Sequence, residues 1–334
     1  MADFNPLNRL PAEAKARLRK RAQPAWVAPM LATLTDERFS REGWLFEPKW
    51  DGERCLAFRS GRDLNLFSRN RKRLNDKYPE ITAAFGRQEN DCFIADGEIV
   101  TFKDGITSFA KLQQRMQVKH PTADLLRKVP VWLYLFDLLY LGRYDTRQVP
   151  LRYRKEVLRH SFNFKGSLQF TEHREKEGEA YYREACGKGW EGIIAKNGAG
   201  QYVSRRTRDW LKFKCHQEQE FVIIGYTDPQ GSRIGFGALL VGFYRRQKLV
   251  YAGKVGTGFD TETLQRLSKK LVQLETPVCA FAGDEVPRRG VHCVKPKLVA
   301  QIGFTEWTNE DKLRHPRFLG LREDKKPEEV VREG

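Results

Sequence analysis

The stretch EPKWDGER, Glu47 to Arg54, organises the interpretation of the whole chain. It alternates: in an extended conformation one side carries Trp44, Phe46, Pro48 and Trp50, and the other carries Glu47, Lys49 and Asp51. Lysine is a nucleophile when deprotonated, and burial or a positioned cation favours that form. Two flanking carboxylates alone would raise the pKa of the lysine and disfavour the deprotonated form. The pattern therefore predicts an added positive group, most simply a metal ion with a polyphosphate. The alternative is a surface strand with a salt bridge.

The composition indicates a folded protein with a polyanionic partner. The chain has 334 residues and a formal net charge of +17. This length is enough for two domains with substantial cores. The Lys and Arg residues are spread along the chain, and a basic protein that also contains many aromatic residues most often binds nucleic acid. The alternative is a basic soluble protein without such a partner.

Cysteine, histidine and hydropathy patterns argue against several other classes. The six cysteines form no C-x-x-C pair, and we predict reduced intracellular thiols rather than a disulfide or zinc framework. The six scattered histidines give little support to a histidine metal site. No apolar run reaches membrane-spanning length, and the N-terminus lacks a signal-peptide core. We therefore expect a cytoplasmic protein.

Three further elements follow in the first half of the chain. Ser68-Arg69-Asn70 leaves the end of a predicted hairpin strand, and Asp96-Gly97-Glu98 interrupts a predicted strand, although alone it would indicate a β-turn. Phe136-Asp137 lies in the apolar run 131–141, which predicts a strand buried on both faces. Asp137 therefore needs a partner, because burying an unpaired charge is costly. A short exposed basic helix is expected within 9–22, and helices are expected over 78–87, 108–117 and 179–186.

Two acidic and basic elements follow in the second half. Glu191-Gly192-Ile193-Ile194-Ala195-Lys196 predicts a strand that begins with a carboxylate and ends with an ammonium group. Lys212 and Lys214 share one face of the next predicted strand. Two adjacent ammonium groups favour an anion such as a triphosphate between or above them. The alternative is an edge strand guarded by lysines.

The expected secondary structure changes after a polar junction at 215–220, from mixed helices and strands to mainly short strands. Short strands are expected at 221–226, 238–245, 249–255 and 299–305, with one amphipathic helix carrying Leu264, Leu267, Leu271 and Leu274. This pattern predicts a small all-β barrel. The glycine-rich segment 253–258 lacks a surrounding βαβ unit, so it indicates a hairpin or a close backbone approach rather than a dinucleotide loop.

Taken in order, these elements resemble the covalent nucleotidyltransferases, which include DNA ligases, RNA ligases and mRNA capping enzymes. Those at 49–54, 96–98, 136–137, 191–196, 210–214 and 322–325 resemble an ATP-dependent DNA ligase over nearly the whole chain. Three phrases resemble the ligase module of bacterial end-joining ligases: FVIIGYT from Phe221, GKVGTGF from Gly253 and RHPRFLGLREDK from Arg314. One departure is Arg71, which replaces the glycine of the family's S-R-N-G element.

The resemblance implies an α+β fold with an adenylation domain of antiparallel sheets and helices, followed by an OB-fold β-barrel. We expect a basic N-terminal extension at 1–25, the adenylation domain at 26–217, the OB-fold domain at 218–325 and a charged, frayed tail at 326–334. Residues 1–25 are too few for a DNA-encircling domain. Polymerase and phosphoesterase domains are not expected.

The resemblance also implies residue roles. Lys49 would be the nucleophile that accepts AMP, with Asp51 in the same motif. Glu47 would meet the adenine amino group and Phe136 would stack on the base. The ribose would contact Arg54 and Glu98, whereas Arg69 and Lys196 would complete the nucleotide site. Glu98 and Glu191 would hold Mg²⁺ or Mn²⁺. The remaining catalytic residues would be Lys212, Lys214, Arg322, Asp324 and Lys325.

The activity implied is the sealing of 5′-phosphate/3′-hydroxyl breaks in duplex DNA, with ATP as the AMP donor and through lysyl-AMP and DNA-adenylate. The partners implied are nicked or broken DNA and a Ku-type end-binding protein, and the protein is expected to be a monomer. An RNA ligase or GTP-dependent capping enzyme is one alternative. A non-catalytic nucleic-acid-binding module is another.

Overall fold

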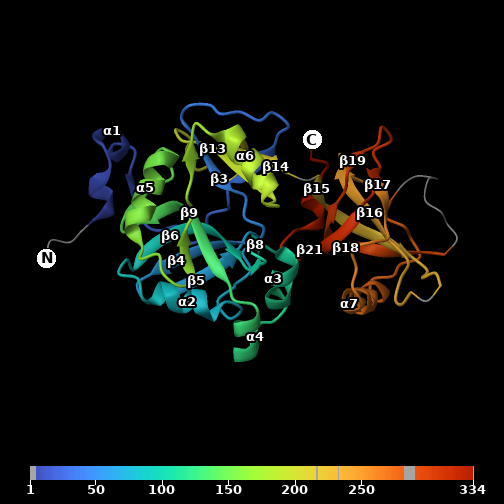
Figure 1. Ribbon diagram of the computed structural model, residues 1–334. Helices are drawn as coiled ribbons and strands as arrows, with labels where there is room; N and C mark the ends of the chain where they lie inside the picture. The colour runs from blue at the N-terminus through green and yellow to red at the C-terminus, as the bar shows by residue number, and fades with distance from the viewer. Residues whose placement is uncertain (1–4, 216, 232, 282–289, 334) are drawn as a thin grey trace. The chain divides into compact units, whose positions relative to one another are not determined.

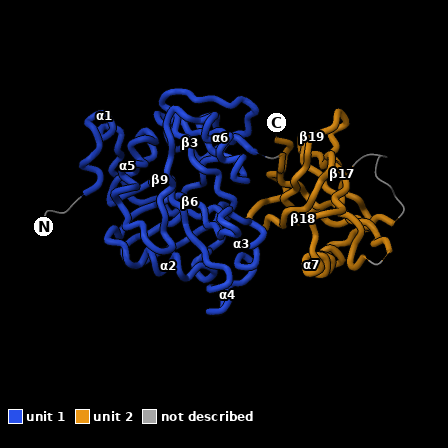
Figure 2. Tube along the Cα trace, viewed as in Figure 1, with its two compact units in different colours: residues 1–215 blue, residues 216–334 orange. Residues whose placement is uncertain are grey.

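The computed structural model describes residues 5–215, 217–231, 233–281 and 290–333, and the chain divides into two compact units, 1–215 and 216–334 (Figures 1 and 2). Each unit has its own core of buried apolar side chains. The first unit mixes helices with two large sheets, whereas strands dominate the second. The two units are described separately.

The larger sheet of the first unit has seven strands in the order β1-β10-β9-β6-β4-β5, with β11 paired to β9. Apart from the parallel β11–β9 pair, its pairings are antiparallel. One face packs on helices and the other belongs to a second cluster around Phe136. The strands are β1 (Arg19–Lys20), β4 (Glu53–Ser60), β5 (Asp63–Ser68), β6 (Cys92–Val100), β9 (Trp132–Leu141), β10 (Tyr144–Asp145) and β11 (Leu168–Phe170).

A second sheet in this unit has the order β12-β3-β13-β14-β2. One face of this sheet carries Phe46, Ile193 and Phe213, which pack against helix α6 (Gly178–Gly187). A small hairpin, β7–β8, stands apart from both sheets. The strands are β2 (Leu31–Leu34), β3 (Trp44–Pro48), β7 (Phe102–Lys103), β8 (Ile106–Thr107), β12 (Arg174–Glu175), β13 (Gly192–Asn197) and β14 (Arg206–Lys214).

The helices expected at 78–87, 108–117 and 179–186 are confirmed within one or two residues. The Ser108 hydroxyl accepts a hydrogen bond from the Lys111 N–H and so caps α3, as its position predicts. Helix α5 was not anticipated, although its residues Leu151, Lys155 and Leu158 recur at helical spacing and are buried. The helices are α2 (Pro79–Gly86), α3 (Phe109–Met116), α4 (Ala123–Lys128), α5 (Leu151–Ser161) and α6 (Gly178–Gly187).

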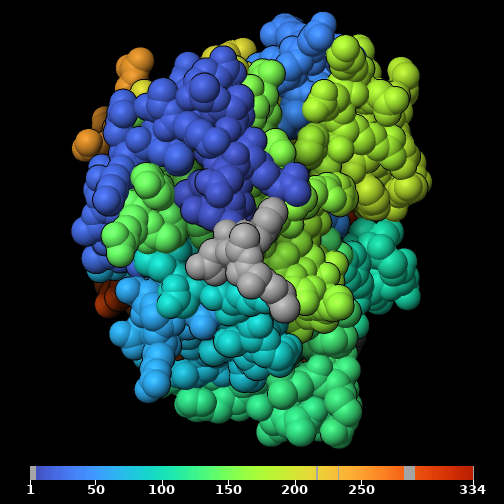
Figure 3. Space-filling model, turned by 90° about the vertical axis from the view of Figure 1, so that its left-hand side faces the viewer, coloured from blue at the N-terminus to red at the C-terminus, as the bar shows by residue number. Residues whose placement is uncertain are grey.

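The N-terminal segment is part of the first unit's core rather than an exposed basic helix. It forms a 3-10 turn (Pro6–Arg9), one helical turn α1 (Ala12–Lys15) and the short strand β1. Leu7, Leu10 and Ala14 are buried in the same cluster as Leu158 of α5. The short helix expected within 9–22 is present as α1, but its expected exposure is wrong on one side, because Ala14 is buried. Figure 3 shows the N-terminal residues, in dark blue, spread over one face of the unit.

The second unit is built on one five-stranded antiparallel sheet in the order β17-β16-β15-β18-β21. The expected helix is present as α7 (Thr261–Val272), which buries Leu264, Leu267 and Leu271. Gly258 has φ +90, and a Cβ there would collide with the Phe318 backbone, which confirms the close approach. The strands of this sheet are β15 (Glu218–Thr227), β16 (Leu239–Arg245), β17 (Lys248–Val255), β18 (Val291–Gly303) and β21 (Arg317–Leu321). Strands β19 (Glu306–Trp307) and β20 (Leu313–Arg314) pair separately with each other.

The C-terminal segment is ordered by contacts with the second unit, so the expectation of a frayed tail is wrong for residues 326–333. It contains a 3-10 turn at Pro327–Glu329. Val330 is buried in the core cluster, and its carbonyl accepts a hydrogen bond from the Tyr244 N–H at 2.7 Å. Within the part of the chain that the structure describes, no helix is long and apolar enough to cross a membrane.

Four of the six cysteines form disulfides, Cys186–Cys215 and Cys279–Cys293, which corrects the prediction of six reduced thiols. Cys55 and Cys92 remain as thiols. The partners are 29 and 14 residues apart in sequence, too far for a C-x-x-C signature. Cys186 ends up beside Cys215 because α6 packs on the sheet that contains β14. The pairing follows from the fold, and the spacing did not reveal it.

Candidate active site

The register of the second sheet brings the distant motifs onto one face. Glu47 of β3 lies opposite Ile194 of β13, which lies opposite Lys212 of β14. Because opposed residues point to the same side of a sheet, Glu47 and Lys212 share a face, and so does Lys196, two residues along from Ile194. Lys49 continues this arrangement, since its N–H donates to the Gly192 carbonyl at 3.0 Å.

Lys49 lies immediately after β3, where the chain turns toward β4. Its ammonium group forms an ion pair with Glu191, and the two side chains are 16% and 9% exposed. Asp51 accepts a hydrogen bond from the Phe109 N–H at 3.2 Å, at the N-terminus of α3, where a carboxylate is favoured. A Cβ at Gly52 would collide with the Ile99 carbonyl, which explains the glycine after Asp51. The surface-strand alternative for this stretch is wrong.

Arg54 forms a paired hydrogen-bonding contact with Asp96, with both bonds at 2.6 Å. Burial opposes the charge of Arg54, but Asp96 outweighs it and raises the pKa of the guanidinium. Arg54 also lies 4.7 Å from the ring centre of Phe136. Glu98 is opposite Arg54 in the strand register and half-buried, so the two share a face. Strand β6 is continuous through residues 96–98, and the β-turn alternative is therefore wrong.

Glu47 is the centre of a buried charge cluster with two lysines. Lys155 Nζ lies 2.5 Å from Glu47 Oε1, and Lys196 Nζ lies 2.6 Å from Oε2. Burial alone would raise the pKa of Glu47, but the two ammonium groups lower it overall. Burial lowers the pKa of Lys196 to about 8, reinforced by Lys155 and opposed by Glu47. Lys196 also lies 4.1 Å from the ring centre of Phe136 and 4.2 Å from that of Trp210.

The two strand lysines and the arginine after β5 have the expected backbone positions. Lys212 and Lys214 lie on β14, which is paired on both sides by β13 and β2, so the edge-strand alternative is wrong. Arg69 directly follows β5. Arg71 has φ +61 and donates its N–H to the Ser68 carbonyl at 2.9 Å. The turn therefore keeps a left-handed residue where the family has glycine, despite the strain that a side chain adds there.

The three residues of the C-terminal signature lie in the second unit and form a folded structure. Arg322 donates two hydrogen bonds of 2.9 Å to Asp324, which is 4% exposed. Lys325 lies 3.0 Å from Glu220. Burial would raise the pKa of Asp324, but Arg322, aided by Lys325, lowers it. The alternative of a solvated charged tail is therefore wrong for this signature.

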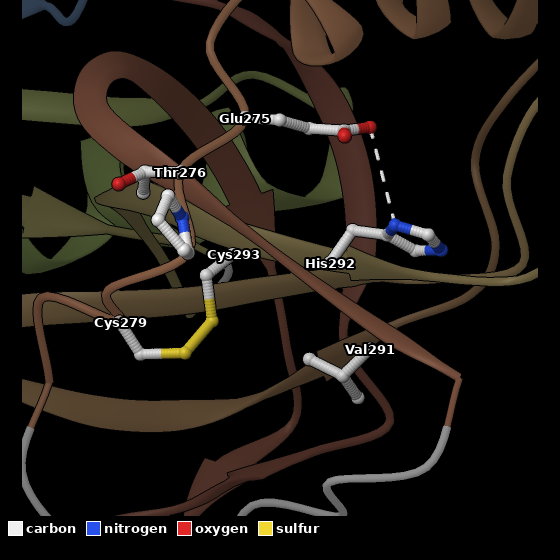
Figure 4. A pocket seen from close by; sticks show the side chains of 7 residues that line it. Glu275, Thr276, Cys279, Val291, His292 and Cys293 are labelled. Carbon is white, nitrogen blue, oxygen red and sulfur yellow. Dashed lines mark ion pairs between the residues drawn. A yellow bond between two sulfur atoms is a disulfide. The ribbon is translucent and has the colours of Figure 1, made fainter.

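A separate pocket of about 390 Å³ lies in the second unit, and none of the predicted site residues lines it. Figure 4 shows the Cys279–Cys293 disulfide on one side and His292 facing Glu275 on the other, with 3.9 Å between His292 Nδ1 and Glu275 Oε1. His292 Nε2 also lies 2.7 Å from Asp228, and its ring stacks on Tyr226. These polar side chains contact one another, and no site is assigned to the pocket.

Glu191 and Glu98 are of a type that fits a divalent cation chemically, although no cluster of three or more His, Cys, Asp or Glu side chains occurs among the described residues. Magnesium needs only one or two protein carboxylates when phosphate and water complete its shell. Glu191 lies beside Lys49, and Glu98 is half-buried on the neighbouring sheet. Both are hard oxygen donors of the type that Mg²⁺ and Mn²⁺ prefer.

Several residues that shape the site were not predicted. Lys155 pairs with Glu47, Asp96 pairs with Arg54, and the Tyr202 hydroxyl donates to Asp96 at 2.7 Å. Asp137, whose need for a partner was predicted, pairs with Arg154, and both side chains are fully buried. The position of Lys155 on the apolar side of a helix was the available signal for a buried charge.

A strand-end lysine beside a carboxylate, with two strand lysines and a buried Glu47–Lys196 ion pair on the same sheet, is the arrangement of a covalent nucleotidyltransferase. Comparison with known families makes this specific. Residues 29–214 match the family described as ATP dependent DNA ligase domain, and residues 232–325 match the ATP dependent DNA ligase C terminal region. The chain belongs to the ATP-dependent DNA ligase family, and its two units are an adenylation domain and an OB-fold domain.

Named relatives include multifunctional end-joining proteins. The chain is 33% identical over 322 residues to the multifunctional non-homologous end joining protein LigD of Pseudomonas aeruginosa, covering 94% of this chain and 37% of that protein. It is 35% identical to LigD of Mycobacterium tuberculosis, covering 92% and 40%. The chain thus spans about two fifths of these relatives. A solved mycobacterial DNA ligase D, complexed with ATP and MES, matches with TM-score 0.65 and 33% identity over 92% of this chain and 98% of that chain.

Proposed function

We propose that this DNA ligase seals 5′-phosphate/3′-hydroxyl breaks in duplex DNA in three steps. Lys49 Nζ attacks the α-phosphorus of ATP, forms a phosphoramidate with AMP and releases pyrophosphate. The AMP then passes to the 5′-phosphate of the break and frees Lys49. The 3′-hydroxyl finally attacks that phosphate, closes the phosphodiester and releases AMP. The observation that carries the proposal is the position of Lys49, at a strand end beside Glu191 and on the sheet that carries Lys212 and Lys214.

The proposed residue roles follow the positions of the side chains. Glu47 accepts a hydrogen bond from the adenine amino group, and Phe136, with cationic groups close to its ring, stacks on the base. Arg54 and Glu98, opposed on adjacent strands, contact the ribose. Asp51 fixes the turn after Lys49 through α3. Arg69 and Lys196 contact the nucleotide, and Lys212 and Lys214 bind its phosphates. Arg322, Asp324 and Lys325 act in the first step, in which Lys49 reacts with ATP.

A divalent cation, Mg²⁺ or Mn²⁺, belongs to the proposal, with Glu191 and Glu98 as its protein ligands. When bound, it would supply positive charge to the phosphates and orient the leaving group. Lys212 and Lys214 provide fixed charge on the same sheet, so the protein's own contribution is to hold the phosphates relative to Lys49. The strand pairing on both sides of β14 keeps these two lysines in register with β13.

The cellular role is proposed from the relatives named for non-homologous end joining. We infer that the chain acts in double-strand break repair in a bacterial cytoplasm, as a monomer and beside a Ku-type end-binding protein. DNA contacts are expected to be mainly with phosphates, because the chain carries a net charge of +17. Nick affinity should therefore fall steeply with salt and vary little with sequence. Affinity that is independent of salt would contradict this mode of binding.

The decisive experiment is an intact-mass measurement after incubation with a nucleotide and a divalent metal. ATP should add one AMP, and nicked DNA should then remove it as the break is sealed. Parallel incubations with GTP, and with nicked RNA in place of DNA, test the capping-enzyme and RNA-ligase alternatives. No adduct with ATP would contradict the proposal and favour a non-catalytic DNA-binding module.

A further inference from the structure

Two lysines contact the single carboxylate of Glu47 in a nearly solvent-free site. Glu47, Lys155 and Lys196 have 1%, 1% and 2% of their surface exposed. One ammonium group would already neutralise this carboxylate, and burying a second is costly unless its contacts repay the lost hydration. Lys196 has a place in the nucleotide site proposed above. Lys155 does not, so its burial needs a different explanation.

Lys155 is held at two points that connect separate elements. From helix α5, its Nζ donates to Glu47 Oε1 at 2.5 Å and to the Thr171 carbonyl at 2.9 Å. The Thr171 hydroxyl in turn accepts a hydrogen bond of 3.2 Å from Trp50, the residue next to Lys49. Lys155 therefore ties strand β3 to the segment after β11. Glu47 lies two residues before the nucleophile, and Thr171 contacts Trp50, the residue after it.

The two lysines hold different oxygens of Glu47. Lys155 contacts Oε1, whereas Lys196 contacts Oε2 and lies against the rings of Phe136 and Trp210. Each carboxylate oxygen accepts up to two hydrogen bonds, so Glu47 can accept another donor while both lysines remain in place. Because Lys155 of α5 holds Oε1, the carboxylate cannot rotate freely. The lone pairs that remain available for another donor therefore point in a fixed direction.

We propose that Lys155 is a positioning residue for base selection, which fixes the Glu47 carboxylate so that it accepts a hydrogen bond from the 6-amino group of adenine. The proposal rests on the base-reading role proposed above for Glu47. It predicts that loss of Lys155 weakens use of a purine with a 6-amino group more than use of one with a 6-oxo group. A purely structural role would weaken both nucleotides equally.

The test compares ATP with inosine triphosphate, which carries a 6-oxo group, as AMP or IMP donors to Lys49 in the full chain. Lys155→Met should lower kcat/KM for ATP about tenfold, the value of one hydrogen bond to a charged group, and change that for inosine triphosphate less than twofold. Lys155→Arg, which keeps the charge, should recover part of the preference. Arg159→Met is the matched control, because Arg159 lies on the same helix, is 46% exposed and pairs with Glu172.

Equal losses with both nucleotides, or an unchanged preference in Lys155→Met, would overturn the proposal. If Lys155→Met does not fold, Lys155→Gln, which loses the charge but keeps a hydrogen-bond donor, should lower kcat/KM for ATP by less than tenfold and still more than that for inosine triphosphate. Equal losses or an unchanged preference in this variant would again overturn the proposal. Glu47→Ala, which removes both acceptor oxygens, separates the two proposals. If it abolishes the preference while Lys155→Met does not, only the role of Lys155 fails. If it leaves the preference intact, the base-reading role of Glu47 fails and the inference fails with it.

Discussion

Lys49 and Glu191 form an ion pair although they are far apart in sequence, Lys49 just after strand β3 and Glu191 just before strand β13. The pairing results from the antiparallel register of β3 and β13, which also joins the Lys49 N–H to the Gly192 carbonyl. The side chain of Lys49 is 16% exposed, so its ammonium group is held in place yet open to a ligand from solvent. This is the position that a nucleophile for a bound nucleotide requires.

The first prediction follows from that position. Lys49→Ala should give no AMP adduct in intact mass after incubation with ATP and metal, and Lys49→Arg should also fail because a guanidinium stays protonated. The exposed Lys188→Ala, on the other side of the same sheet, is the control and should form the adduct normally. An adduct of unchanged mass in Lys49→Ala would show that another residue carries the AMP.

The second prediction concerns the fully buried pair Asp137 and Arg154, joined by hydrogen bonds of 2.7 and 2.8 Å. Asp137→Ala should lower the free energy of unfolding by about 3–5 kcal/mol, because it leaves the Arg154 charge buried without its carboxylate. Asp124→Ala on the surface of α4 should change it by less than about 1 kcal/mol. Equal denaturant midpoints for the two variants would show that the buried pair contributes no more than the exposed one.

The third prediction concerns the disulfides. Thiol titration of the protein, denatured without a reductant, should detect two thiols, Cys55 and Cys92, and six after full reduction. Cys186→Ser with Cys215→Ser should lower the free energy of unfolding by about 3–4 kcal/mol, since the bond closes a loop with a separation of 29 residues. Cys92→Ser is the control. Six free thiols before reduction would restore the original prediction of reduced cysteines.

The difference between what was predicted and what was found has a physical pattern. The strand that carries Lys212 and Lys214, the capped helix after Ser108 and the need of Asp137 for a partner were all predictable, because they depend on local periodicity, capping and burial. The partners of Glu47 and Arg54 were not predictable. They are set by the register between distant strands and by a helix packed behind them. The cysteine pairs were missed for the same reason.

The fourth prediction uses the titration of Lys196, whose pKa burial lowers from 10.5 to about 8. Below that pH the ammonium group is charged and pairs with Glu47; above it the charge is lost and nucleotide contact weakens. The KM for ATP in self-adenylation should therefore rise between pH 7 and pH 9 by severalfold. Lys196→Arg keeps its charge throughout this range and should give a flat profile. Identical profiles in the two proteins would assign the pH dependence to another group.

The fifth prediction separates the steps of the reaction. In-line displacement requires pyrophosphate to leave on the side of the α-phosphorus opposite Lys49. Groups supplied by a second domain can stabilise the negative charge of the leaving pyrophosphate and then move away before DNA binds. Arg322, Asp324 and Lys325, all in the second unit, are the candidates. They should be needed when ATP is the substrate but not when AMP is already on the DNA.

Asp324→Ala and Lys325→Ala should therefore lower self-adenylation strongly, yet seal a nick with a pre-adenylated 5′ end at a rate much closer to wild type. The Lys325 variant is the more direct test, because it leaves both side chains of the two hydrogen bonds between Arg322 and Asp324 in place. Lys326→Ala changes the next, exposed lysine and should alter neither reaction. Thermal midpoints establish that each variant is folded. If the rates of self-adenylation and of sealing fell equally in a folded Lys325→Ala protein, the step-specific role would be wrong and a general role in DNA contact would replace it. The reason is that only a group used after adenylation would slow the sealing of a pre-adenylated nick.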